Sequence, residues 1–212
     1  MRSISRSRVW QPAGLLVLLL SQPASAHIPV LRGRLIDLIQ RSDVVVLGMA
    51  EQVRTLGTRH VDTDFRVDTV LAGTLPERTV TFRGPNGIAT GDRYVVFLRR
   101  TGSSFESIQP SGTIFPSRPQ DDDGYRRAVQ SISQALRTDG ATQVVLVRAT
   151  LITTLSASAP PLRYHAALEL AALVSDGHRP TEIEQQRLAT LLASPSFDPA
   201  LRPLLTSIAA TP

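Results

Sequence analysis

The sequence has 212 residues, with 23 arginines, no lysine, 18 aspartates and glutamates, and no cysteine. The absence of cysteine excludes thiol catalysis, cysteine-ligated zinc, iron–sulfur clusters and disulfides. Without residues 1–26 the chain holds 20 arginines against 18 acids, and this net charge of +2 gives no support for binding nucleic acid.

The first 26 residues have the features of a secretory signal peptide. Residues 1–10 carry three arginines and no acid, and residues 13–20 form the apolar run AGLLVLLL. Ala24 and Ala26 have the small-residue spacing of a cleavage site. The run is shorter than the roughly 20 residues that span a bilayer. We therefore expect export to the periplasm or beyond, cleavage after Ala26, and no membrane span in the mature chain.

Cleavage after Ala26 makes His27 the first residue of the mature protein. A terminal amine and the imidazole of the same residue can chelate one Cu(II), because copper prefers nitrogen donors. A loose chain end without a ligand is the simpler interpretation. A copper-binding protein that uses His27 as its metal ligand is therefore an alternative, and the sequence predicts no cofactor.

Short strands are predicted between residues 42 and 110, after a segment at 27–41 with one short helix. Apolar or alternating runs occupy residues 43–55, 60–73, 78–82, 92–100 and 104–109. Alternation with a period of two, as at residues 64–69, is typical of a half-buried strand. Asn86 and Gly87 favour a tight turn, so residues 83–92 are predicted to form a hairpin. Closely spaced short strands predict a small antiparallel five-stranded β-barrel.

The pattern changes to helices after a proline-rich stretch, and we place a linker at residues 111–120. Helical spacing of apolar residues follows from residue 121 to 212. Thr181 and Glu184 have the spacing of a capping box. Residues 142–156 are rich in β-branched side chains that would suit a strand, but their apolar spacing favours a helix. The predicted fold class is α+β, a barrel followed by an α-helical region.

Three motifs in the strand region have the pattern of a known family. An SD-apolar-Gly segment lies at 42–48, VxxVLxG at 67–73, and GxxY-apolar-xFL at 91–98. Residues 36–108 thus resemble exported bacterial domains related to the TIMP/netrin-like OB-fold, which implies an OB-like barrel at 42–110. Animal members inhibit metalloproteases through an N-terminal cysteine tethered by a disulfide. This chain has no cysteine, and a TIMP-like protease inhibitor is kept as a second alternative.

The helical region resembles HEAT-type repeats at one place. The segment PPLRYHAALELAAL, residues 160–173, is similar to the second helix of such a repeat. Stacked repeats normally need three or more units, and at most two helix pairs fit here. A small helical bundle packed on the barrel is the other interpretation.

The candidate binding residues lie on one predicted strand and in the connection that follows the next predicted strand. Asp62, Asp64 and Arg66 share one strand face, and Arg83 and Asn86 lie in the predicted hairpin. A solvated ion-pair face explains these charges better than a catalytic carboxylate pair. The sequence has no G-x-S-x-G, H-E-x-x-H or P-loop motif. We therefore expect a non-enzymatic protein that acts in binding or envelope assembly through contact of the barrel with an unknown protein partner.

Overall fold

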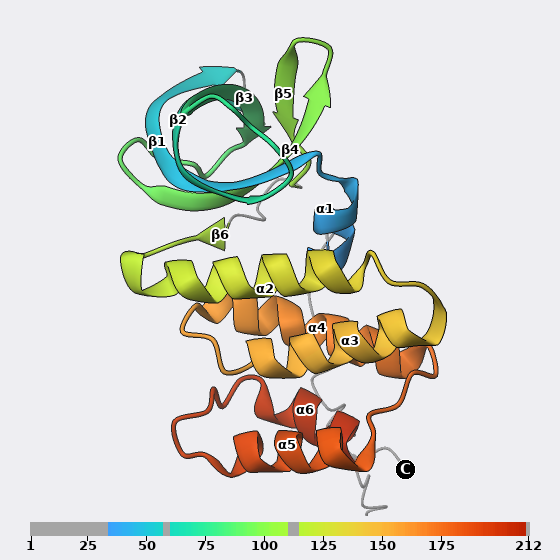
Figure 1. The fold of residues 1–212 in the computed structure, drawn as a ribbon. Helices are drawn as coiled ribbons and strands as arrows, with labels where there is room; N and C mark the ends of the chain where they lie inside the picture. Colours follow the sequence, from blue (N-terminus) through green and yellow to red (C-terminus); the bar gives the residue numbers. More distant parts are fainter. Residues whose placement is uncertain (1–33, 57–59, 110–114, 211–212) are drawn as a thin grey trace, which may run out of the picture. The chain divides into compact units, whose positions relative to one another are not determined.

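The computed structural model describes residues 34–56, 60–109 and 115–210, and five of its strands close into a barrel (Figure 1). The strands are β1 (Val44–Leu56), β2 (His60–Ala72), β3 (Thr79–Pro85), β4 (Arg93–Thr101) and β5 (Ser104–Ser107). They confirm the five strands that the sequence predicts. The predicted signal peptide and His27 lie outside the described residues.

The barrel closes because β1 pairs with both β2 and β4. The strand order is β1-β2-β3-β5-β4, and every pairing in the ring is antiparallel except that of β3 with β5, which is parallel. The predicted hairpin at 83–92 is therefore wrong, because β4 has β1 and β5 as its neighbours and does not pair with β3. Residues 86–92 instead connect two strands that are not adjacent, and the hydroxyl of Tyr94 accepts a hydrogen bond from the Ala89 N–H at 3.0 Å.

Strands β1 and β4 are buried on both faces. Val46 and Val96 pack inside the barrel, whereas Val45 and Phe97 pack on its outer side against helices. This double burial explains why both strands are nearly continuous apolar runs, while β2 alternates between apolar and polar residues.

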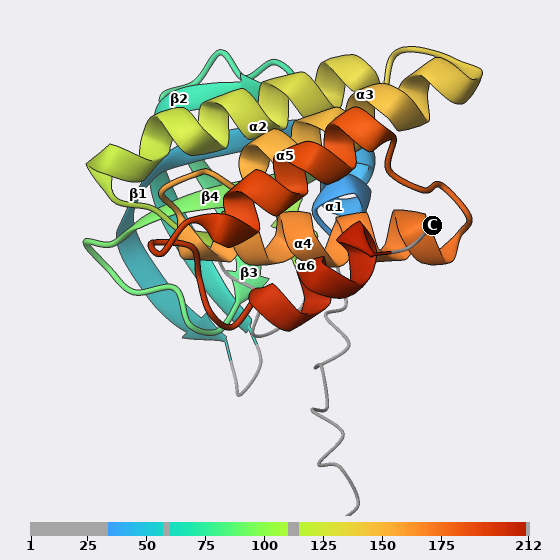
Figure 2. The ribbon, with the colours of Figure 1, turned by 90° about the horizontal axis from the view of Figure 1, so that it is seen from below.

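Helices precede and follow the barrel in the described part of the chain. Their bounds are α1 (Leu35–Arg41), the 3-10 turn η1 (Pro119–Asp121), α2 (Asp122–Ala135), α3 (Gly140–Thr154), α4 (Pro160–Ser175), α5 (Glu182–Ala193) and α6 (Arg202–Ala209). Helix α3 confirms the predicted helix at residues 142–156. Helix α2 lies beside the barrel and α5 and α6 lie farthest from it (Figures 1 and 2). No helix among the described residues is long and apolar enough to cross a membrane.

The predicted capping box at the start of α5 is confirmed, and it also links two helices. The Thr181 N–H donates to the Glu184 carboxylate at 2.8 Å, and the Glu184 N–H donates to the Thr181 hydroxyl at 3.4 Å. The same carboxylate accepts from Arg148 Nε on α3 at 2.7 Å. Both charged side chains are buried, so this ion pair fixes α5 against α3.

One hydrophobic core is shared by the barrel and the helices, and Phe115 lies at its centre. Phe115 is fully buried in the two-residue strand β6 (Phe115–Pro116), which pairs with β4. Its ring lies 5.3 Å from that of Phe97 in the barrel, 6.4 Å from that of Tyr125 on α2 and 4.5 Å from that of His165 on α4. The described part of the predicted linker at 111–120 thus packs into the core as well as connecting the two regions.

Arg93 adds a polar connection between the same two regions. Its guanidinium donates to Asp68 on β2 and, at 2.7 Å, to Asp122 at the start of α2. Asp122 also accepts from the Ser117 hydroxyl at 2.7 Å. The start of α2 is therefore held to β2, to β4 and to the segment after β6.

Replacement of Phe115 by alanine should destabilise the barrel and the helices together. Removal of a fully buried phenylalanine typically costs about 3–5 kcal/mol. We expect the free energy of unfolding in urea to fall by about that amount, in a single transition when unfolding is followed by circular dichroism. Hydrogen exchange should show that the amides of β4 and of α4 lose protection to the same extent. The exposed replacement Val145→Ala on α3 should change the free energy of unfolding by less than about 0.5 kcal/mol. Loss of exchange protection in the helices alone would contradict the shared core.

Candidate functional site

The outer face of β2 and β3 carries charged and hydroxyl side chains. Thr63 and Phe65 are fully buried, so Asp62, Asp64 and Arg66, which alternate with them along β2, point outward. In β3, Thr81 lies opposite Asp64 and Arg83 lies opposite Asp62. The alternation predicted for residues 64–69 therefore places the predicted binding residues of β2 on the solvent side of the barrel.

These outward side chains form a network of ion pairs. Two nitrogens of Arg54 on β1 donate to the two oxygens of Asp64, at 2.8 and 3.0 Å, and the Thr81 hydroxyl donates to the same carboxylate at 2.7 Å. The Arg54 guanidinium and the Thr81 hydroxyl hold the pKa of Asp64 below its usual value. Arg66 lies 3.5 Å from Asp68 and 3.9 Å from Glu51. Exposed pairs of this kind contribute little to stability.

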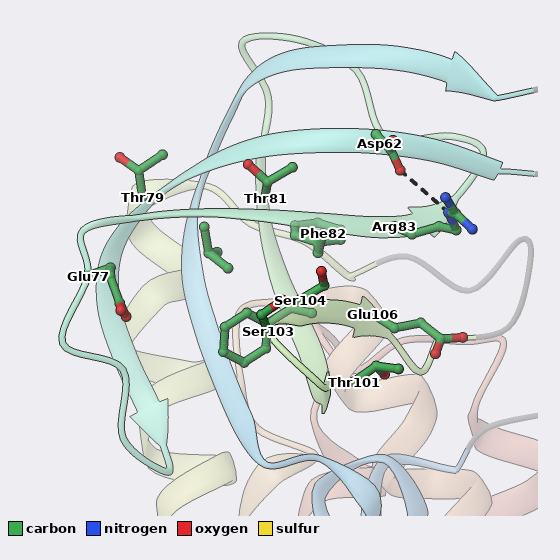
Figure 3. A pocket seen from close by; sticks show the side chains of 12 residues that line it. Asp62, Glu77, Thr79, Thr81, Phe82, Arg83, Thr101, Ser103, Ser104 and Glu106 are labelled. Atoms are coloured by element: carbon green, nitrogen blue, oxygen red, sulfur yellow. Dashed lines mark ion pairs between the residues drawn. The ribbon is translucent and has the colours of Figure 1, made fainter.

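Next to this face, a groove separates β3 from the turn between β4 and β5 (Figure 3). Its volume is about 660 Å³. The lining residues are Asp62 of β2; Glu77, Thr79, Val80, Thr81, Phe82 and Arg83 on and before β3; and Thr101, Ser103, Ser104, Phe105 and Glu106 of β4, β5 and their turn. Figure 3 shows the β3 side chains on one side and the serine and threonine side chains of the turn on the other.

The groove exists because β5 is shorter than β3. The parallel pairing joins only Phe82 to Phe105 and Arg83 to Glu106, so the earlier residues of β3 have no described strand beside them on this side. The Val67 N–H donates to the Arg78 carbonyl at 2.7 Å, so Arg78 and every second residue after it direct their N–H and C=O groups towards β2. The N–H and C=O groups of Thr79 and Thr81 therefore point away from β2 and face the groove.

The chemistry of the lining is polar and acidic. Five hydroxyl groups come from Thr79, Thr81, Thr101, Ser103 and Ser104. Asp62, Glu77 and Glu106 supply three carboxylates against the single guanidinium of Arg83, and Arg83 lies 3.5 Å from Asp62. Such a lining favours a ligand that donates hydrogen bonds and carries positive charge.

No group of three or more histidines, aspartates and glutamates is arranged to hold a metal ion among residues 34–56, 60–109 and 115–210. The copper alternative depends on His27, which lies outside these ranges.

The structure brings only part of the predicted site together. Asp62 and Arg83 line the groove, whereas Asp64 and Arg66 stay on the adjacent outer face. Asn86 lies in the turn after β3 and outside the lining. Sequence reasoning missed Glu77, which directly precedes β3, and the residues from the β4–β5 turn, because the parallel pairing that brings the turn to β3 leaves no periodic signal. The polar segment 101–104 is the one feature that could have indicated an exposed turn.

Comparison with known proteins adds no relative, since no protein-family model and no curated protein matches the chain. The closed five-stranded barrel is compatible with an OB-like fold.

Two buried titratable side chains lie on α4, away from the groove. Burial lowers the pKa of His165 to about 4. Burial raises the pKa of Glu169 to about 7, although its carboxylate accepts a hydrogen bond from the Ile36 N–H at 3.1 Å. Near Glu169, Arg34 lowers this pKa and Asp37 raises it. Glu169 thus accepts a hydrogen bond from the first turn of α1 with a carboxyl group whose pKa is raised to about 7.

The two groups should give opposite pH dependences of stability. The folded-state pKa of Glu169 is raised from 4.5, so its contribution is complete below pH 4.5 and is lost as the pH rises towards 7. The folded-state pKa of His165 is depressed from 6.5, so its contribution is complete above pH 6.5 and is lost as the pH falls towards 4.

Single replacements should separate these effects, measured as the free energy of unfolding in urea at pH 5 and pH 7. Relative to the unmodified protein, Glu169→Gln should gain about 2 kcal/mol of stability on going from pH 5 to pH 7, because the falling contribution is removed. His165→Gln should lose about 2 kcal/mol over the same interval. Changes of the same sign in the two variants would contradict the assignment.

Proposed function

We propose that the barrel is a non-enzymatic binding module that captures an extended segment of a partner protein in the groove between β3 and β5. The observation that carries the proposal is the open edge of β3 at Thr79 and Thr81. An exposed strand edge presents N–H and C=O groups that pair readily with another strand. Addition of a strand from a partner is a recurrent mode of peptide recognition.

The dimensions and charges of the groove support this mode. Thr79, Val80 and Thr81 extend over about 10 Å at the rise of a β-strand, enough for a short stretch of added strand. Main-chain hydrogen bonds would supply affinity, and the side chains that line the groove would supply specificity. Glu77, together with the other carboxylates of the lining, favours a segment with a lysine or arginine.

The cellular setting is also a proposal. We propose that the protein is exported after cleavage behind Ala26, that it belongs with the TIMP/netrin-like OB-fold domains, and that it acts in envelope assembly. The charged start and apolar run of residues 1–26 and the three strand motifs support these statements. The copper-binding and protease-inhibitor alternatives both require a free amino terminus at His27. Addition of one residue before His27 should abolish either of them and leave capture in the groove unchanged.

The strand-addition mode can be tested with peptides selected from a random display library against the mature protein. Thr79→Pro removes the N–H that faces the groove, and at the first position of β3 it leaves the hydrogen bonds to β2 in place. We expect the affinity of selected peptides to fall about tenfold, the equivalent of one or two main-chain hydrogen bonds. The matched variant Thr79→Val keeps the N–H and should bind within about threefold of the unmodified protein.

Two further measurements make this experiment decisive. N-methylation of alternate residues in a selected peptide should abolish binding, whereas methylation of the residues between them should not, because successive N–H groups of a strand point to opposite sides. Glu77→Gln, which removes a carboxylate of the lining, should weaken binding of a selected peptide that carries lysine or arginine, and Arg66→Ala, which alters a side chain outside the groove, should not. Equal affinities for the Thr79→Pro and Thr79→Val variants would contradict strand addition.

A further inference from the structure

A second hollow, of about 450 Å³, lies where the ends of several elements meet around β5. Its lining consists of Arg41, His60, Arg83, Gly84, Pro85, Arg99, Glu106, Ser107, Ile108 and Gln109. It shares Arg83 and Glu106 with the groove described above, but none of its other residues. Its chemistry differs, because its charges are mainly positive.

Three arginines and one histidine line this hollow, and they come from four elements. Arg41 is the last residue of α1, His60 is the first residue of β2, Arg83 belongs to β3 and Arg99 belongs to β4. Glu106 is the single carboxylate in the lining. The three arginines and one glutamate give the lining a net charge of +2 with His60 neutral.

The arginines are only weakly engaged by protein carboxylates. Within the described part of the chain, Arg41 forms no ion pair. Arg83 lies 3.5 Å from Asp62, and Arg99 lies 3.5 Å from Glu106. The side chains of Arg83 and Arg99 are 61% and 49% exposed, and such exposed pairs are weak. The guanidinium groups can therefore turn towards a ligand at little cost.

We infer that this hollow binds a phosphate group. Like charges that line one hollow repel one another, and a bound anion with two negative charges offsets that repulsion. Guanidinium groups match phosphate oxygens because they donate two parallel hydrogen bonds. The floor is polar and ordered, since the buried Ser107 hydroxyl donates to the Gln109 side-chain oxygen at 3.2 Å and accepts from the Gln109 N–H at 3.3 Å.

The test is a calorimetric titration of the mature protein with inorganic phosphate at low ionic strength. We expect saturable binding of one phosphate per chain, weakened at least tenfold in Arg41→Gln and in Arg99→Gln. The matched control is Arg126→Gln on α2, where the arginine is 46% exposed and pairs with Asp123 at 3.0 Å. It should retain the affinity of the unmodified protein. Absence of saturable binding, or equal losses in all three variants, would overturn the inference.

A second set of titrations identifies the source of the phosphate. Tighter binding of glycerol 3-phosphate than of inorganic phosphate indicates a soluble phosphomonoester, and binding to vesicles of phosphatidic acid that Arg41→Gln abolishes indicates a lipid headgroup. If neither exceeds inorganic phosphate, the free ion is the ligand.

The inference is independent of strand addition at β3. Thr79→Pro should leave phosphate binding intact, and Arg41→Gln should leave peptide capture intact, so that failure of either proposal is recognised separately. A loss of phosphate affinity in Thr79→Pro comparable to that in Arg41→Gln would show that the two sites are not distinct.

Discussion

The burial of one side of the barrel wall against the helices is the constraint on which the structure depends. Strands β1 and β4 carry apolar side chains on both faces, and such strands require cover on both sides. The inner faces meet inside the barrel. The outer faces meet α1, α2 and α4 around Phe115, which is contributed by the short strand that follows the barrel. The helices thus supply the side chains that cover the outer faces of β1 and β4 and complete the shared core.

This one-sided cover leaves the opposite part of the barrel available for binding. No described residue of β3 or β5 belongs to the core shared with the helices. Both strands carry polar side chains outward, and they pair over only two residues. The open edge of β3 is therefore a consequence of how the barrel is closed, and the charged lining keeps it from pairing indiscriminately with apolar strands. The arginine-lined hollow follows from the same closure, because it forms where the end of α1, the start of β2 and the last parts of β3 and β4 meet around the short β5.

Local patterns predicted most of the fold, and long-range pairing explains what they missed. The period of two in β2, the capping box of Thr181 and Glu184, and the apolar spacing of α3 are each produced within a few residues, so the sequence shows them directly. The parallel contact of β3 with β5 joins residues more than 20 positions apart and has no such pattern. The hairpin prediction failed for this reason, since a turn motif indicates a reversal of the chain but not which strands become neighbours. The burial of Phe115 in a proline-rich stretch was missed because its partners lie on three other elements.

Residue-resolved hydrogen exchange of β3, in the free protein and with a selected peptide bound, would show whether a partner strand pairs with the edge of β3. We predict that the Thr79 and Thr81 amides exchange rapidly in the free protein and become protected when the peptide binds. The Val80 and Phe82 amides, which face β2, should be protected in both states. Unchanged exchange at Thr79 and Thr81 on binding would contradict the claim that the open edge of β3 is the binding site.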